Sequence, residues 1–146
     1  MTMQSIAVCG AGTMGAGIAQ IAAYSGFGTV LFDTLPEALA RAEAQIGKSL
    51  GAAVEKGKLT TDEKENVLQR IKFTTAIEDC VADVIIEAIV EKMAAKTALF
   101  NQLAAINSAA TVFATNTSSL SVSGIAASVG NHASRVAGMH FFNPAH

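Results

Sequence analysis

The 146-residue sequence predicts an α/β fold, a doubly wound, mostly parallel sheet with helices on both faces. Short apolar runs that suit buried strands alternate with segments whose apolar residues recur at helical spacing, and this alternation is typical of such sheets. A glycine-rich turn joins the first predicted strand to the first predicted helix. The length is typical of one domain, so we expect a single domain over residues 1–146.

The first elements are predicted from residue type and spacing. The apolar run at 5–9 suits a buried strand, and from Thr13 apolar residues recur at helical spacing until Gly26 ends the helix. A second buried strand is expected at 29–32. Apolar residues between 35 and 53 then have the spacing of a long amphipathic helix.

The alternation continues along the rest of the chain. Thr60 and Glu63 have the spacing of a capping box at the start of a short helix. The later elements are expected as helix 60–70, strand 71–74, strand 83–88, helix 93–107, strand 111–115, helix 122–129 and strand 135–140. Strands separated by helices favour parallel pairing, because each connection crosses back over one face of the sheet.

Composition and charge argue against several classes of partner. The net charge is only −2, so no basic surface for nucleic acid or for an anionic membrane is expected. Residues 1–32 carry no charge, but glycines interrupt them, and a membrane span needs about 20 apolar residues. Cys9 and Cys80 fit no metal-ligand spacing, so no metal site is predicted and both are expected to be buried thiols of a cytoplasmic protein.

The motif Gly10-Ala11-Gly12-Thr13-Met14-Gly15 has the pattern GxGxxG between a predicted strand and a predicted helix. In this setting Gly10 permits the tight turn, Gly12 lets a pyrophosphate approach the backbone, and Gly15 lets the helix pack closely on the strand. The start of the helix offers free N–H groups and a positive dipole end to the phosphates. We therefore predict a Rossmann-type dinucleotide site in which these six residues bind the cofactor.

Asp33 follows the second predicted strand and indicates which dinucleotide is bound. It lies 18 residues after Gly15, near the spacing of about 20 that is typical of a ribose-binding carboxylate. A carboxylate accepts from ribose hydroxyls and repels a 2′-phosphate, and no Arg or Lys lies between Asp33 and Arg41. We expect Arg41 to pair with Glu37 on the outer helix face. NAD is therefore predicted rather than NADP, and the fingerprint by itself also suits FAD.

Three later stretches each follow a predicted strand and carry polar groups. They are 87–91 with Lys96, 116–120 and 140–144. Because ligands bind beyond the carboxyl ends of strands in open α/β sheets, all three are expected near the glycine turn.

Together these motifs resemble a known family. GAGTMGAGIAQ, EAIVE, NTSSL and GMHFFNP are similar, in this order, to the NAD-binding domain of the L-3-hydroxyacyl-CoA dehydrogenases, including the bacterial 3-hydroxybutyryl-CoA dehydrogenases. The resemblance runs from the first strand to the last residue. It implies an enzyme, belonging to fatty acid metabolism and β-oxidation, in which a 3-hydroxyacyl-CoA gives a hydride to NAD and becomes a 3-ketoacyl-CoA.

The resemblance also implies catalytic roles. His140 matches the catalytic base, and histidine suits this role because its ordinary pKa of about 6.5 lies near working pH. Ser118 matches a hydroxyl beside the nicotinamide and the reacting substrate oxygen. Taken alone, His140 would more often be a core histidine, and Ser118 would more often cap a helix. Phe141 and Phe142 are expected to pack rather than to react.

Binding roles follow from the same resemblance. Cofactor contacts are implied for Glu91, Lys96 and Asn143, with Asn116 beside them in the strand-end motif. Ser49 and Lys56, on the long helix, match positions that touch the CoA moiety. An alternative for Glu91 and Lys96 is that they are solvated surface charges.

Members of the resembled family continue beyond HFFNP. A glutamate that orients the histidine is followed by a helical domain that completes the acyl-CoA cleft and forms a homodimer. The resemblance therefore implies that residues 1–146 are a catalytically incomplete NAD-binding domain without that helical domain. The alternatives are a stand-alone, non-catalytic NAD-binding module, a structural relative such as a lens crystallin, and a dehydrogenase that acts on a free 3-hydroxy acid.

Overall fold

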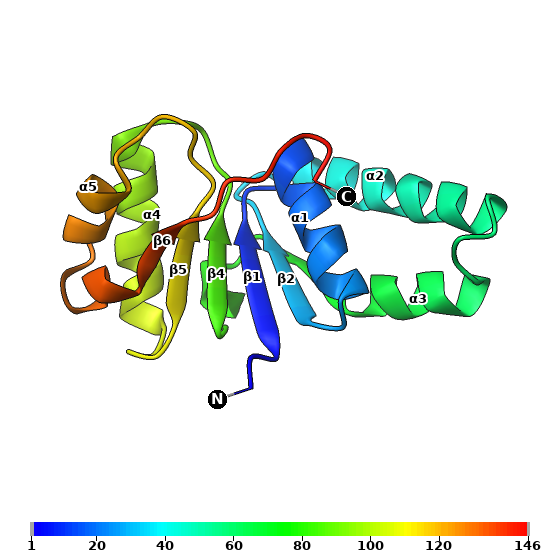
Figure 1. Cartoon of the computed structure of the whole chain (residues 1–146), viewed down its shortest axis with the longest axis horizontal. Coiled ribbons are helices and arrows are strands. Elements are labelled where there is room, and N and C mark those ends of the chain that lie inside the picture. The colour runs from blue at the N-terminus through cyan, green and yellow to red at the C-terminus, as the bar shows by residue number, and fades with distance from the viewer. Residues whose placement is uncertain (1, 146) are drawn as a thin grey trace.

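The computed structural model describes residues 2–145 and contains one sheet with helices on both sides (Figure 1). The strands are β1 (Ser5–Cys9), β2 (Gly28–Phe32), β3 (Ile71–Thr74), β4 (Val84–Glu87), β5 (Val112–Thr115) and β6 (Val136–Gly138). The helices are α1 (Thr13–Tyr24), α2 (Pro36–Glu55), α3 (Thr61–Gln69), α4 (Met93–Ile106) and α5 (Val122–Ala127), with the 3₁₀ turns η1 (Ile77–Asp79) and η2 (Gly130–Arg135).

The sheet confirms the predicted fold class. Its strand order is β3-β2-β1-β4-β5-β6, and every neighbouring pair is parallel. The chain runs outward from β1 in one direction and then returns to start again at β4. The switch point between β1 and β4 is where open α/β sheets place their ligands, beyond the carboxyl ends of the strands.

The two faces of the sheet bury separate hydrophobic clusters. Val8 points to the cluster that α1, α2 and α3 cover, whereas Ala7 and Cys9 point to the cluster that α4 and α5 cover. This follows from the period of two along a strand. Because both faces are covered, the central strands are apolar on both sides, as the sequence predicted.

The uncharged N-terminal stretch supplies the centre of the fold. It forms β1, α1 and β2, and most of its apolar residues are buried in the two clusters. Within residues 2–145, no helix is long and apolar enough to cross a membrane. Cys9 and Cys80 are both buried and form no disulfide, as predicted. A hydrogen bond with Cys80 and burial raise the pKa of the Cys9 thiol.

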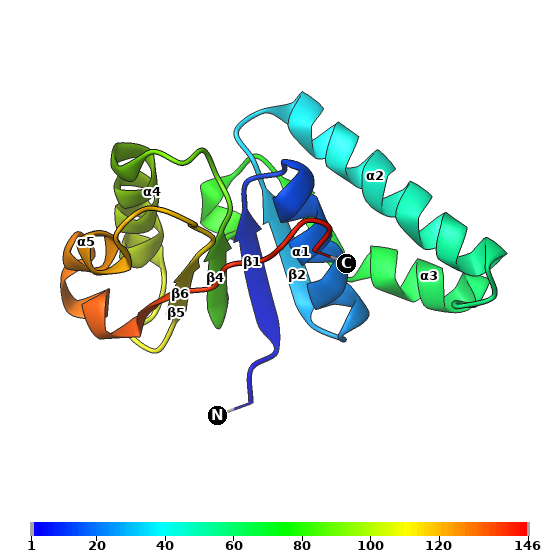
Figure 2. The same ribbon diagram turned by 45° about the horizontal axis from the view of Figure 1, so that its top comes forward.

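The last predicted strand is shorter than expected. The sequence predicted 135–140, but β6 covers Val136–Gly138, and residues 130–135 form a 3₁₀ turn. The ladder ends with a bond from Met139 N–H to Thr115 O, at 2.9 Å. Beyond this bond the chain leaves the sheet edge and runs past β4 and β1 toward α1 (Figures 1 and 2). The predicted capping box is confirmed: Thr60 Oγ1 accepts from Glu63 N–H at 3.1 Å.

Asp83 joins the start of β1 to the start of β4, and we expect this junction to weaken in acid. Its Oδ2 accepts from Gln4 N–H at 2.8 Å, from the Ser5 hydroxyl at 2.9 Å and from Ser5 N–H at 3.0 Å. These bonds, the one from Gln4 most, hold the pKa of Asp83 below its ordinary value. A lowered folded-state pKa stabilises the fold above the unfolded pKa of about 3.9, and the contribution is lost as pH falls through the folded value.

The measurement compares the thermal midpoints of wild type and Asp83→Ala by circular dichroism. Asp83→Ala should melt lower than wild type at pH 7, and the gap should close by pH 3. Glu65→Ala, on an exposed face of α3, is the control and should match wild type at both pH values. A gap of equal size at pH 3 and pH 7 would contradict the carboxylate role.

Candidate functional site

The glycine turn between β1 and α1 has one open position. A Cβ on Gly10, whose φ is +105°, would lie 2.5 Å from Ala88 O, and a Cβ on Gly15 would lie 1.7 Å from Gly10 O. A Cβ on Gly12 would meet no protein atom within 4 Å. Gly10 and Gly15 are thus required by the fold itself. Gly12 instead faces open space, which is the arrangement that close approach of a pyrophosphate needs.

The start of α1 leaves backbone donors at this opening. The first bond of the helix runs from Ala16 N–H to Gly12 O, at 2.9 Å. The N–H groups of Thr13 and Met14 therefore lie ahead of the first helical bond and can bind an anion at the positive end of the helix dipole.

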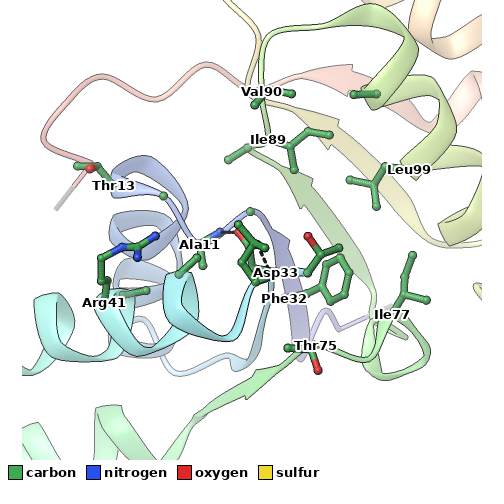
Figure 3. Close-up of a pocket in the computed structure, with 18 of the residues that line it drawn as sticks. Ala11, Thr13, Phe32, Asp33, Arg41, Thr75, Ile77, Ile89, Val90 and Leu99 are labelled. Carbon is green, nitrogen blue, oxygen red and sulfur yellow. Dashed lines mark hydrogen bonds between the residues drawn. The ribbon is translucent and has the colours of Figure 1, made fainter.

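Asp33 connects the glycine turn to the start of α2. Its Oδ2 accepts from Ala11 N–H at 2.8 Å, and its Oδ1 accepts from Leu35 N–H at 3.0 Å (Figure 3). Each carboxylate oxygen keeps a further lone pair, because an ionised carboxylate accepts about four hydrogen bonds. Asp33 can therefore hold the turn and accept from ribose hydroxyls at the same time.

A cleft of about 950 Å³ lies over the switch point, within the usual range for small-molecule sites. Its walls come from the glycine turn, the end of β2, α2, η1, the loop after β4 and α4 (Figure 3). Of the residues predicted to bind cofactor, the lining includes Gly10, Ala11, Gly12, Thr13 and Asp33. Arg41 also lines the cleft (Figure 3) and forms no ion pair with Glu37 among the described residues, so the predicted surface pair was wrong.

Lys96 is buried beneath the carboxyl ends of β4 and β5 and pairs with Glu87. Its Nζ lies 2.7 Å and 2.9 Å from the two Glu87 oxygens, and both side chains are 0% exposed. Glu87 also accepts from Ile89 N–H at 2.7 Å and from the Thr115 hydroxyl at 2.6 Å. The alternative of a solvated charge is therefore wrong for Lys96. In the sequence, the only sign of this pair was that Glu87 ends the otherwise apolar run at 84–87.

Glu91 links this buried pair to the loop after β5. It lies 3.3 Å from Lys96 Nζ and accepts from the Thr117 hydroxyl. Partial burial acts to raise the pKa of Glu91, but the Thr117 hydrogen bond and the Lys96 ammonium together hold it below its ordinary value. Thr117 Oγ1 also accepts from Leu120 N–H at 3.0 Å. The 88–91 loop and the 116–120 loop are thus joined, as their strand-end positions predicted.

The terminal motif joins the same edge through Asn116. Its Oδ1 accepts from Phe141 N–H at 2.8 Å, and its own N–H donates to Glu87 O at 2.8 Å. All three predicted strand-end stretches therefore meet at the carboxyl edge of the sheet.

The candidate catalytic side chains lie exposed at this edge. His140 is exposed, with its ring 4.9 Å from that of Phe142, so a core role for this histidine is wrong. Ser118 is exposed and does not cap α5, because Ser121 accepts from Gly124 N–H as the cap. Phe142 is 78% exposed, whereas Phe141 packs on the core that includes α1. Asn143 is also exposed.

Residues 5–146 match the family model described as the NAD-binding domain of 3-hydroxyacyl-CoA dehydrogenase. The chain belongs to this family. The predicted family and the predicted cofactor, NAD, are thereby confirmed.

Relatives of this NAD-binding domain are similar over almost the whole chain. Identity is 47% over 146 residues with the 3-hydroxyadipyl-CoA dehydrogenase of Escherichia coli (strain K12), covering 99% of this chain and 30% of that protein. It is 46% over 145 residues with the probable 3-hydroxybutyryl-CoA dehydrogenase of Bacillus subtilis (strain 168), covering 99% and 50%. A crystal structure of 3-hydroxybutyryl-CoA dehydrogenase from E. coli K12 matches with a TM-score of 0.96 at 46% identity, covering 99% and 31%. The chain thus spans half or less of these relatives.

Of the two positions predicted to touch CoA, Ser49 lies on α2 and Lys56 directly follows this helix. Ser49 Oγ accepts from Gln20 Nε2 of α1 at 3.0 Å, which leaves its hydroxyl hydrogen for another acceptor. Lys56 is exposed at the end of α2. Neither residue lines the cleft of 950 Å³. Gln20 was not predicted to have a role. A polar residue on the buried face of a helix usually has a hydrogen-bond partner, and this pattern could have indicated Gln20.

Proposed function

We propose that this chain binds NAD in the cleft and forms the dinucleotide-binding part of an enzyme that interconverts L-3-hydroxyacyl-CoA and 3-ketoacyl-CoA. The observation that carries the proposal is the open side of Gly12 next to Asp33, at the edge where Ser118 and His140 are exposed. The opening suits a pyrophosphate, and the carboxylate suits a ribose. The neighbouring edge offers a base and a hydroxyl.

The proposed cofactor contacts extend along this edge. The pyrophosphate lies against Gly12 and accepts from the free N–H groups of Thr13 and Met14, while Gly10, Ala11 and Gly15 shape the turn. Asp33 accepts from the adenosine ribose. Glu91, Asn143 and Ser118 contact the nicotinamide end. The fully buried Lys96 acts from beneath them, because its ammonium sets the charge and position of Glu91. NAD supplies the hydride acceptor when bound.

The proposed chemistry of the chain's own residues is acid–base work. His140 Nε2 or Nδ1 takes the proton of the substrate hydroxyl during oxidation and returns it during reduction. The Ser118 hydroxyl donates to the same substrate oxygen. Ser49 and Lys56 hold the CoA moiety, with the Lys56 ammonium attracting its phosphates.

The whole enzyme is proposed to be a cytoplasmic homodimer. In the relatives, the matched region is 30% or 50% of the length, which leaves room for a further domain. We propose that a helical domain of this kind completes the acyl-CoA site and supplies an acid that orients His140. Residues 1–146 alone should then bind NADH but should turn over acetoacetyl-CoA only slowly.

Calorimetric titration with NADH and NADPH tests the cofactor proposal. We expect saturable NADH binding and NADPH binding that is weaker by about tenfold or more, because the Asp33 carboxylate repels the 2′-phosphate of NADPH. Asp33→Ala should weaken NADH binding and narrow the difference between the two cofactors. Glu65→Ala on the exposed face of α3 is the matched control and should leave both titrations unchanged. Equal affinity of the wild-type chain for both cofactors would contradict the role of Asp33.

A further inference from the structure

We propose that Asn116 is the positioning residue of His140: its amide oxygen fixes the backbone on which the candidate base stands. This inference rests on the proposed function, because it concerns the base of that reaction. It changes the role that the sequence suggested for Asn116, from a cofactor contact to a support of the terminal segment.

Asn116 is itself held firmly. It directly follows β5, and its N–H donates to Glu87 O of β4 at 2.8 Å. Its neighbour Thr117 is bound to Glu91, and Glu91 lies against the buried Lys96. The Asn116 side chain therefore projects from a backbone that is bonded to β4 and that precedes a residue anchored through its own side chain, so it is a well-placed acceptor.

Among the described residues, two hydrogen bonds hold the backbone on either side of His140. Met139 N–H donates to Thr115 O at 2.9 Å, and Phe141 N–H donates to Asn116 Oδ1 at 2.8 Å. Within residues 140–145, as far as the structure describes the segment, the Asn116 bond is the single hydrogen bond to the rest of the protein. His140 is thus held between two consecutive acceptors, the second of which is a side chain.

The donor on Phe141 also determines the orientation of the Asn116 amide. Only Oδ1 can accept from an N–H group, so Nδ2 must point the other way. Among the described residues, no acceptor contacts this Nδ2.

The side chain of Phe141 packs on the core, but the His140 ring is exposed and contacts Phe142, which is itself exposed. The His140 ring therefore has little packing of its own, and it is placed by the two backbone bonds together with the packing of Phe141 and Ala145 on the core.

Loss of this bond should loosen the base without unfolding the domain. A single hydrogen bond to a partly buried backbone group is a small part of domain stability. The position of a catalytic group matters far more, since a misplacement of about 1 Å can cost about a hundredfold in rate. Positioning and folding can therefore be separated by experiment.

The test compares Asn116→Ala, which removes the acceptor, with Asn116→Asp, which keeps one. The control is Asn101→Ala on the exposed face of α4. In residues 1–146, the Phe141 amide of Asn116→Ala should exchange about tenfold faster than that of wild type, as measured by NMR. This factor corresponds to the loss of about one hydrogen bond. Exchange across β5 should not change. The ring signal of His140 should move toward that of a free histidine as its contact with Phe142 is lost. Asn116→Asp should return both the Phe141 exchange rate and the His140 ring signal to their wild-type values.

NADH titration of the same variants separates positioning from cofactor binding. We expect Asn116→Ala to raise the Kd for NADH by less than about tenfold, because Asn116 itself makes no cofactor contact and the loosened segment carries one proposed contact, Asn143. A Kd raised more than about tenfold, with Phe141 still protected, would overturn the proposal in favour of direct contact. Unchanged Phe141 exchange in Asn116→Ala would also overturn it. Failure of the wild-type chain to bind NADH would count against the proposed function, while the exchange result would still decide the role of Asn116.

Discussion

Gly15→Ala is expected to destabilise this domain more than any other conservative change in the glycine turn, by at least about 3 kcal/mol, the upper end of the usual cost of overpacking. The added Cβ would lie 1.7 Å from Gly10 O. That atom belongs to the backbone of the β1–α1 turn, so no side-chain rotation can relieve the contact. Either α1 moves away from β1 or the turn opens, and both lose buried contacts. Thermal and urea unfolding followed by circular dichroism measure the loss.

Gly12→Ala should have the opposite effect: it should leave the stability of the fold nearly unchanged and weaken NADH binding. Gly12 has φ of −72°, which an alanine adopts, and its Cβ would meet nothing within 4 Å. We expect the free energy of unfolding to stay within about 1 kcal/mol of wild type. The methyl group would occupy the space through which the pyrophosphate approaches, so the Kd for NADH should rise by at least about tenfold.

Gly47→Ala is the matched control for both changes. Gly47 lies inside α2, and a Cβ there also meets no atom within 4 Å. Alanine is the better helix former, so this variant should be as stable as wild type or slightly more stable, with unchanged NADH binding. NADH affinity that survives in Gly12→Ala would mean that the open side of the turn is not where the cofactor enters.

Lys96→Met is expected to cost about 3–5 kcal/mol of folding free energy, a large fraction of the stability of a domain of this size. Glu87 and Lys96 are 0% exposed, and Nζ lies 2.7 Å and 2.9 Å from the two carboxylate oxygens. Removing the ammonium leaves the Glu87 carboxylate buried without its counter-charge. Chemical unfolding at pH 7 measures the difference in the free energy of unfolding between wild type and Lys96→Met.

A double-mutant cycle distinguishes this pair from simple packing. Lys96→Met combined with Glu87→Leu removes both charges, and the double variant should be more stable than Lys96→Met alone. The surface pair Lys72–Asp79, with Nζ to Oδ1 at 2.8 Å and side chains 61% and 31% exposed, provides the control. Lys72→Met should change stability far less, because solvent screens exposed charges. Additive losses in the cycle would show that the two buried charges do not support each other.

The sequence by itself determined the architecture and part of the site. Strand and helix periods predicted the alternating order, and the parallel sheet followed from it, as the structure confirms. The glycine turn and the capping box at Thr60 were readable because each depends on residues only a few positions apart. The meeting of 87–91, 116–120 and 140–144 at one edge followed from the geometry of parallel strands.

Tertiary structure decided the partner of each polar side chain. Lys96 is buried against Glu87, Asn116 binds the backbone beside His140, and Arg41 lines the cleft instead of pairing with Glu37. Apart from the acid that ends the apolar run at 84–87, the sequence carries no local signature of these contacts. Periodicity indicates which face of an element is buried, because burial repeats with the turn of the helix or the pleat of the strand. Which charge meets which donor depends on how separate elements are offset when they pack, and that offset is set by the whole core.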